Sequence, residues 1–433
     1  MAFLTDLDSR AAIKGSRDPL ATQSIWVPLG RKIVGNLSTV STSVRDFTVL
    51  MLGFWLIERA VEQGADEPEV SLFLKWEQLA GYVRVEHKLG AFRGVDRARA
   101  NRAQGSKLTL SADRAHQILS NQKIYGLWGL YTVPGRSSGL LADDPLRLTP
   151  RAREFVERMY LPVLSKAGFR DGNALVKLLL ARTARIDLEG KDAALGKALA
   201  SILRADRMTV AERTFYDDVL VQGGPGDDTE GRQRRLAALL FETVDDEDFA
   251  FSPQTMDELA KAAGDRDEAG SLAMRLERIR YCESMLAPAA RLFGYLLARD
   301  GKRPEEIADE VRETWGTGLG HLNLPRIAEL RDELTLILGG AEGAERWLAI
   351  AGDLRHGRYE DVVLRLIQHN KVVMQQRGGA APWVELRQGR LHVAFRDEDG
   401  ELTEKKSLPS LWRSSYFLDA LRSVVAQVRR TAS

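Results

Sequence analysis

The chain has 433 residues and carries 62 lysines and arginines against 61 aspartates and glutamates, so its net charge is only +1. This length predicts two or three domains, because a single hydrophobic core stops growing at about 250–300 residues. The single cysteine, Cys282, excludes an internal disulfide and a cysteine-based metal site, and the most apolar run, 47–57, is too short for a membrane span of roughly 20 residues.

These features predict a cytoplasmic protein without a membrane partner. The first residues have no basic stretch followed by an apolar one, so no secretory signal is expected. Arginine outnumbers lysine and alanine is abundant, which favours a GC-rich bacterial source.

The first helix is predicted where the apolar run begins. Ser43 is suited to cap it, Asp46 lies three residues further on, and residues 47–57 supply a wide apolar face. The preceding residues, 1–40, mix turn formers with isolated apolar residues and predict a segment docked on a surface.

Between Leu72 and Tyr160 the patterns predict two helices, a strand, a turn and a returning strand. Thr149 and Pro150 have the residue types that cap and open a further helix. The predicted elements are helices at 72–83 and 112–123, strands at 130–133 and 146–149, and a turn at 134–139.

The same region is strongly basic. From Arg84 to Lys123, nine lysines and arginines face three acidic residues, which gives roughly +6. Residues 84–107 are also rich in small residues and are expected to form an arm that orders on phosphates. The alternative is a solvated loop whose arginines cover neighbouring apolar surface.

Residues 150–370 are helical in pattern, without a fixed repeat, and predict an irregular helical domain. Residues 383–395 alternate apolar and polar side chains around a turn and predict a β-hairpin, followed by an amphipathic helix over 415–428. We therefore expect a mainly α protein whose three parts are 1–160, 161–370 and 371–433.

The sequence lacks the common catalytic motifs. It has no phosphate-binding loop, no nucleophile elbow and no histidine pair with metal-ligand spacing, so we expect no catalytic residue, no metal and no cofactor.

Two patterns only partly match nucleases. His369 and Lys371 begin a His-x-Lys motif whose acidic position is Gln376. Around the C-terminal hairpin, the residues Glu385, Asp397, Glu404 and Lys406 loosely resemble the metal-binding arrangement of restriction-type nucleases.

The order of elements over 72–158 resembles the winged-helix domain of bacterial DNA-binding proteins. The exit 148–154 reads Leu-Thr-Pro-Arg-Ala-Arg-Glu and is similar to the Leu-Thr-x-x-Gly-x-Glu exit of such domains, with Ala152 in place of glycine. The remaining helical chain is similar in style to accessory proteins of bacterial anti-phage or DNA-modification loci.

This resemblance implies a recognition helix at 112–123 in the major groove, and an arm and wing on the phosphates. The implied recognition contacts are Arg114, Gln117, Asn121 and Lys123, and the implied phosphate contacts are Arg93, Arg97, Arg99, Arg102 and Arg136. Tyr125 or Trp128 is expected to stack on a base only if it faces solvent.

The expected function is that of a DNA-binding accessory or adaptor protein in a bacterial multi-protein system, such as anti-phage defence or DNA modification. Its expected partners are double-stranded DNA and a partner protein such as an enzyme. Two alternatives stay open: a metal-dependent nuclease that uses the hairpin, and a protein-binding scaffold that never touches DNA.

Overall fold

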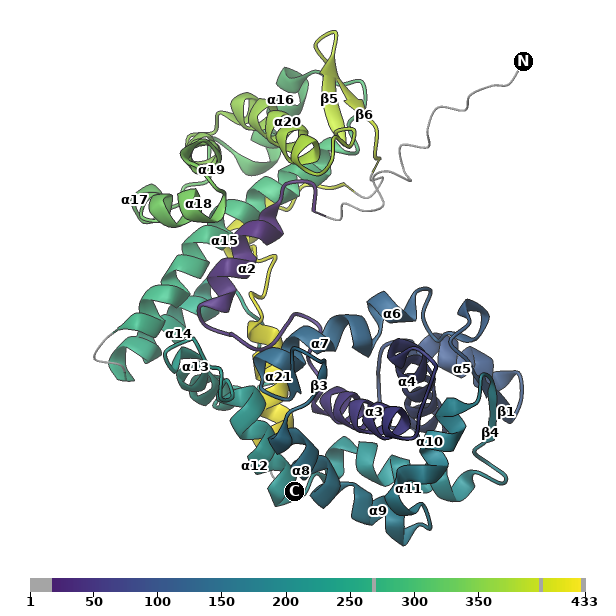
Figure 1. Cartoon of the computed structure of the whole chain (residues 1–433). Coiled ribbons are helices and arrows are strands. Elements are labelled where there is room, and N and C mark those ends of the chain that lie inside the picture. Colours follow the sequence, from purple (N-terminus) through teal and green to yellow (C-terminus); the bar gives the residue numbers. More distant parts are fainter. Residues whose placement is uncertain (1–17, 267–269, 397–399, 430–433) are drawn as a thin grey trace, which may run out of the picture. The chain divides into compact units, whose positions relative to one another are not determined.

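The computed structural model describes residues 18–266, 270–396 and 400–429 (Figure 1). It is mainly helical, with 62% helix and 5% strand, and it has a C-terminal β-hairpin followed by a helix. The predicted fold class is confirmed in these respects.

The chain divides into two compact units. Unit 1 contains the residues up to Ile33 together with Asp248–Tyr416, and unit 2 contains Val34–Glu247 together with the residues from Phe417 on. Each unit joins two distant segments of the chain. Local sequence periodicity carries no signal for such long-range joining.

Unit 1 is built around one long helix, α15, which packs against α2, α14 and α20. Its helices and strands are α2 (Thr22–Arg31), α14 (Pro253–Arg266), α15 (Ser271–Leu296), α16 (Pro304–Trp315), α17 (Leu324–Ala328), α18 (Arg331–Ile337), α19 (Ala341–Arg355), α20 (Tyr359–Gln376), β5 (Val384–Arg387), β6 (Arg390–Val393) and the 3-10 helix η5 (Lys405–Ser410).

The hairpin of β5 and β6 is antiparallel, with Val384 opposite Val393. Gln388 and Gly389 form its turn with φ values of 51° and 73°, the left-handed conformation that a tight two-residue hairpin turn requires. The outer edge of β6 is also covered, because Leu391 exchanges backbone hydrogen bonds of 2.8 Å with residues 301 and 302. The hairpin is therefore an integral part of unit 1.

Unit 2 surrounds α3. Its elements are α3 (Val44–Glu62), α4 (Glu69–Glu86), α5 (Val95–Ala103), β1 (Lys107–Leu110), η1 (Arg114–His116), α6 (Gln122–Tyr125), α7 (Leu127–Ser137), β2 (Leu141–Ala142), β3 (Arg147–Leu148), α8 (Pro150–Met159), α9 (Leu161–Lys166), η2 (Arg170–Gly172), α10 (Asn173–Leu180), β4 (Ala184–Asp187), α11 (Ala193–Leu203), η3 (Ala205–Arg207), α12 (Val210–Tyr216), the π-helical segment η4 (Asp217–Val221), α13 (Arg232–Phe241) and α21 (Leu418–Arg429).

Helix α3 is the core helix that the apolar run predicted. It is buried along almost its whole length and contacts α4, α7, α8 and α10 (Figure 1). Gly53 lets α4 approach closely, since a Cβ there would lie 2.6 Å from the ring of Phe73. The indole of Trp76 donates a 2.8 Å hydrogen bond to the carbonyl of Val49, which fixes α4 against α3.

The structure corrects the predicted helix at 112–123. This segment contains the 3-10 turn η1, extended residues, and only the beginning of the short helix α6. The side chain of Gln117 accepts the backbone N–H of Gln122 at 3.0 Å, and that of Gln122 accepts the N–H of Ile118 at 3.2 Å. Buried glutamines therefore supply hydrogen bonds that a continuous helix would make through its own backbone.

The predicted strand at 130–133 is also wrong, because these residues lie in α7, which also includes the start of the predicted turn. Leu127, Tyr131 and Pro134 are buried at helical spacing on one side of α7. Their packing against the rest of unit 2 outweighs the local β propensity of Tyr131, Thr132 and Val133.

The elements after α7 agree better with the sequence. Strands β2 and β3 pair, with Leu141 opposite Leu148. The Thr149 hydroxyl then caps α8 by accepting the N–H of Ala152 at 3.3 Å, and Pro150 occupies the first turn. The order helix, short hairpin, helix is thus present in α7, β2, β3 and α8.

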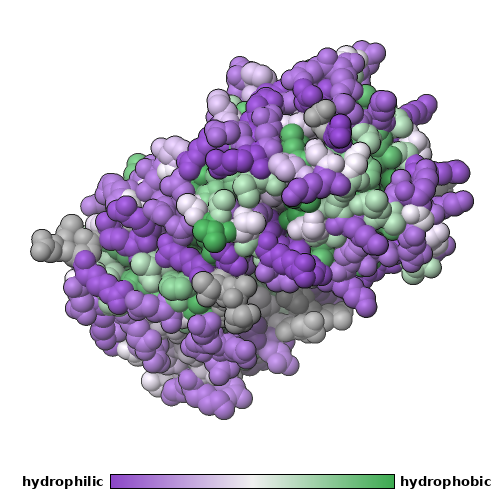
Figure 2. Space-filling view, turned by 90° about the horizontal axis from the view of Figure 1, so that it is seen from below, coloured by the Kyte–Doolittle hydropathy of each residue, from purple (hydrophilic) through white to green (hydrophobic). Residues whose placement is uncertain are grey.

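On the face seen in Figure 2, hydrophilic residues dominate and hydrophobic residues show as separate patches. In the part of the chain that the structure describes, no helix combines the length and apolar character needed to cross a bilayer.

Candidate functional site

One layer of unit 2 gathers the basic residues that the sequence singled out. Residues 91–125, which we call the basic cover, lie over one face of α4. Gln78 holds the backbone of Ser111 through two hydrogen bonds of 2.8 and 3.0 Å. Further along α4, Tyr82 accepts a 3.0 Å hydrogen bond from Asn101. Between them, Gly81 leaves space for the basic cover to pack closely.

The end of the basic cover is fixed to α4 by Glu77. Its carboxylate accepts the N–H of Leu127 at 2.7 Å and the side-chain amide of Gln122 at 2.8 Å. Gly126 is pressed against this carboxylate, since a Cβ there would lie 2.6 Å from it. Burial raises the pKa of Glu77 to about 7, with a further rise from the negative charge of Asp46.

Most cations of the basic cover take no part in these contacts. Five side chains are exposed, and none of them makes an ion pair or side-chain hydrogen bond with another described residue. They are Arg97, Arg99, Lys107, Arg114 and Lys123. Exposed cations that make no ion pair with a described carboxylate are available to phosphates.

The pairing of β1 with β4 adds another cation to this surface. Leu108 and Ile186 face inward, whereas Lys107 and Arg185 lie on the solvent face of the two strands. Sequence reasoning missed Arg185, because β4 follows β1 only after more than seventy residues. The alternation of buried and exposed residues in 184–187 is the signal that marks it.

Two of the predicted phosphate contacts are already paired within the unit. Arg102 forms ion pairs with Glu86 at 2.7 Å and with Glu189. Arg136 lies on α7, outside the basic cover, and pairs with Asp143 at 2.8 Å. A ligand would have to compete with these carboxylates.

One predicted base contact serves the local fold. Gln117 is buried, and its side-chain amide donates a 2.8 Å hydrogen bond to the carbonyl of Ala112. Asn121 is half-buried, and its backbone carbonyl accepts the N–H of Tyr125 at 2.9 Å at the start of α6. Gln117 in particular cannot reach a ligand without unfolding the segment.

Arg93 occupies an intermediate position. It is half-buried and lines a cavity of about 10 Å³ with Asp46, Glu77 and Arg84. Arg84 donates a 2.6 Å hydrogen bond to Asp46, while its second terminal nitrogen has no described partner. Arg93 thus lies beside two buried carboxylates and one buried guanidinium, rather than with the exposed cations.

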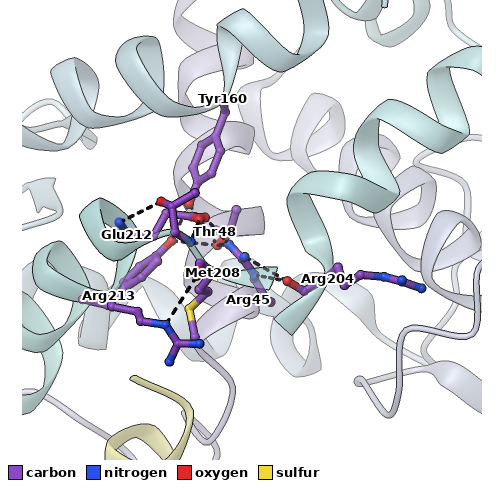
Figure 3. Close-up of polar contacts among 9 residues, drawn as sticks. Arg45, Thr48, Tyr160, Arg204, Met208, Glu212 and Arg213 are labelled. Atoms are coloured by element: carbon purple, nitrogen blue, oxygen red, sulfur yellow. Dashed lines mark hydrogen bonds and ion pairs between the residues drawn. The ribbon is translucent and has the colours of Figure 1, made fainter. Parts of the chain in front are cut away.

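A second polar cluster of unit 2 lies under the surface (Figure 3). Arg45 on α3 is 3% exposed and donates to Glu212 at 2.5 Å and to the carbonyl of Arg204 at 2.9 and 3.1 Å. Glu212 also accepts the N–H of Thr209 at 2.7 Å, which caps α12. The buried charges thus find partners inside the unit.

Three hydroxyl groups extend this cluster. Thr48 lies 2.6 Å from the hydroxyl of Tyr216, which lies 3.0 Å from that of Tyr160. Burial raises the pKa of Tyr216 to about 12 and holds the pKa of Tyr160 well above its usual value, so neither phenol is activated as a nucleophile at neutral pH. We refer to these residues together with Arg45 and Glu212 as the buried network, and its contacts indicate a structural role.

An open pocket of about 810 Å³ lies next to the buried network, between α8, the π-helical segment η4 and the end of α21. Three of the four arginines that line it closely contact acidic side chains or backbone carbonyls, and the fourth, Arg158, lies 3.8 Å from Glu154. The contacts are Arg151 with Asp218 at 2.5 Å, Arg429 with Asp217 at 2.7 Å, and Arg213 with the carbonyls of residues 427 and 428 at 3.3 and 3.2 Å. The pocket therefore offers mixed and largely compensated charge.

The histidine of the partial His-x-Lys motif is unsuited to attack phosphorus. His369 is buried, and its Nε2 lies 2.9 Å from the carbonyl of Leu20, a contact in which the ring must donate. Burial lowers the pKa of His369 to about 4.

The hairpin carboxylates do not form a metal site within the described residues. Glu385 pairs with Arg387 at 2.6 Å, and Glu404 pairs with Lys406 at 2.8 Å. Asp397 lies outside the described residues. Among those that are described, no three histidine, cysteine, aspartate or glutamate side chains are grouped so that they could hold a metal ion.

Comparisons with protein-family models, with curated proteins and with solved structures find no match for this chain. Its function must therefore be inferred from the arrangement of its own residues. The basic cover is a layer of unit 2 that gathers several exposed cations without an ion-pair partner among the described residues.

Proposed function

We propose that the chain binds double-stranded DNA through the basic cover, as an accessory or adaptor protein of a bacterial multi-protein system. Such a system would be anti-phage defence or DNA modification, and the second partner would be a protein that supplies the enzymatic step. The observation that carries the DNA-binding part is the set of exposed cations without acidic partners on one layer of unit 2.

The positions of these cations favour contact with phosphates. A lysine or arginine that neutralises a phosphate releases condensed counterions, which makes affinity depend on salt. Arg97 and Arg99 project from α5, and Arg114 lies in the 3-10 turn η1. Because 112–123 is not a continuous helix, we assign Arg114 and Lys123 to the DNA backbone rather than to base edges.

The proposal keeps the winged-helix resemblance but assigns the recognition helix to a different segment. The helix that precedes the short hairpin of β2 and β3 is α7, so α7 takes the place of the recognition helix that the sequence assigned to 112–123. Its outward side carries Gly129, Val133 and Arg136.

The test is the salt dependence of duplex binding. We expect the Arg97→Gln/Arg99→Gln/Arg114→Gln/Lys123→Gln variant to keep its thermal stability. The slope of log affinity against log salt should fall in magnitude by about 3 to 4 units, at about 0.9 per phosphate contact. Fluorescence anisotropy of a labelled duplex measures this slope.

The matched control removes the same charge from other exposed positions of unit 2, as Lys166→Gln/Lys177→Gln/Lys191→Gln/Lys197→Gln. Its slope should stay close to that of the wild-type chain. Equal losses in both variants would show that only net charge matters and would contradict the assignment to the basic cover.

A single pair of variants refines the assignment. Arg99→Gln should reduce the slope by about one unit, whereas Arg102→Gln should reduce it less, since Arg102 is held by Glu86 and Glu189. A larger loss for Arg102→Gln would mean that a paired arginine changes partners on binding.

A further inference from the structure

Two large apolar side chains are exposed at the end of the basic cover. Ile124 is 53% exposed and Tyr125 is 41% exposed, directly after Lys123. Single exposed apolar residues are common on protein surfaces, but these two adjoin the cations proposed to bind phosphates. A ligand that fits this position has phosphate groups for the cations and apolar groups for Ile124 and Tyr125.

Tyr125 is the aromatic residue of this region that meets the condition for base stacking. The other candidate, Trp128, packs into the core of unit 2. Its ring stacks on Phe54 at 5.4 Å with an interplanar angle of 22°, and it meets Phe73 edge-on. Tyr125 instead faces solvent over much of its surface.

The backbone under Tyr125 is tightly held. Its N–H donates to the carbonyl of Asn121 at 2.9 Å, and the N–H of Gly126 donates to that of Gln122 at 2.8 Å. Gly129 brings α7 close to α6, since a Cβ there would lie 2.6 Å from the carbonyl of Lys123. The ring is thus carried on a short, well-fixed helix.

We propose that Tyr125 and Ile124 contact unpaired bases, and that the preferred ligand is duplex DNA with a single-stranded extension. This inference rests on the proposed function. Within a duplex the base faces are stacked and hidden, so an exposed ring gains little there. An unpaired strand offers base faces, and stacking on an aromatic side chain strengthens binding by roughly tenfold or more per base with little sequence preference.

The positions of the residues assign each of them to one part of the ligand. The cations of α5 and η1 bind phosphates of the duplex part. Lys123 binds the backbone where the strand leaves the duplex, and Tyr125 and Ile124 receive the first unpaired bases. Phosphate contacts set the affinity, and the apolar pair sets the preference for unpaired bases.

The experiment compares a blunt duplex with a duplex of the same length that carries a single-stranded extension, at equal salt, by anisotropy. The wild-type chain should bind the extended duplex more tightly. Tyr125→Ala should remove roughly a tenfold advantage and leave blunt-duplex affinity unchanged, while Tyr125→Trp should retain the advantage. Val210→Ala, which truncates a residue of unit 2 that is 81% exposed outside the basic cover, should change neither affinity.

A second measurement does not depend on a variant. With 5-iodouracil at the first unpaired position, irradiation should crosslink the strand to residues 124–125, as mass spectrometry of the peptides would show. Equal affinity for the two probes, or an advantage that survives Tyr125→Ala, contradicts the inference and leaves the proposed function standing. Failure of the wild-type chain to bind either probe contradicts the proposed function itself.

Discussion

The arginines of the basic cover and of the buried network, both in unit 2, differ in their burial and in their partners. In the buried network, Arg45 has its donors directed at Glu212 and at a backbone carbonyl, and it is almost fully buried. In the basic cover, Arg97 and Arg99 are exposed and have no ion-pair partner among the described residues. The partners of an arginine, more than its presence in a sequence, separate a structural role from a binding role.

The basic cover does not depend on its exposed cations for its place in the fold. Neutral hydrogen bonds from Gln78 and Asn101, and the carboxylate of Glu77, attach it to α4. Its exposed charges can therefore be removed with little cost to stability, whereas the charges of the buried network cannot. The following predictions test this difference.

The largest effect is expected from Arg45→Ala. This change leaves the carboxylate of Glu212 buried without its cation, and we expect a loss of about 3–5 kcal/mol in the free energy of unfolding. Chemical denaturation followed by circular dichroism measures it. The control on the same helix is Arg59→Ala, which removes an exposed pair with Glu62 and should cost about 0.5–1 kcal/mol. Similar losses for the two variants would mean that the buried network adds no more stability than a surface ion pair.

A smaller effect is expected where the basic cover meets α4. Gly126→Ala places a methyl group against the Glu77 carboxylate and the carbonyl of Gln122, and we expect a loss of about 1–3 kcal/mol in stability. Gly105→Ala is the control, because a Cβ there has no atom within 4 Å. Thermal melts of both variants decide the matter, and a Gly126→Ala chain as stable as the control would contradict this close packing.

A further expected effect is a dependence of stability on pH. The pKa of Glu77 is raised from 4.5 to about 7 in the folded chain, so between these values the folded state binds the proton more tightly than the unfolded state. The stabilisation is complete below pH 4.5 and is lost as pH rises through 7. Relative to Glu77→Gln, the melting temperature of the wild-type chain should fall between pH 5 and pH 8. If the difference in melting temperature between the two chains stayed constant across that range, the raised pKa of Glu77 would be contradicted. The neighbouring charged residues Asp46, Arg84 and Arg93 are the same in both chains, so they do not account for the difference.

The sequence predicted the elements whose signals are local. The helix after Ser43, the hairpin around Gln388 and Gly389, and the capped helix after Thr149 have distinctive caps, turns or periodicity. Of the nine predicted contacts, Arg97, Arg99, Arg114 and Lys123 prove to be exposed.

What the sequence missed depends on contacts between distant residues. Nothing in the sequence near Tyr131 indicates that the Tyr131 side chain is buried in unit 2, so the local pattern predicts a strand where the structure has α7. The burial of Gln117 depends on the fold around α4. The pairing of β1 with β4 places Arg185 opposite Thr109, on the same face as Lys107, although the two strands are far apart in the sequence. Charge counting located the basic cover, but it did not separate paired from exposed cations.

The two-segment construction of unit 2 has a consequence for synthesis on the ribosome. The first N–H of α3, that of Val44, donates to the side chain of Gln427 at 3.0 Å, and Gln427 in turn donates to the carbonyl of Thr42 at 2.6 Å. Arg422 also donates a 2.6 Å hydrogen bond to the carbonyl of Thr243. The central helix of this unit emerges early but receives its last partners only after all of unit 1 has been translated. Until then the nascent chain must hold an incomplete unit in a state that neither aggregates nor is degraded.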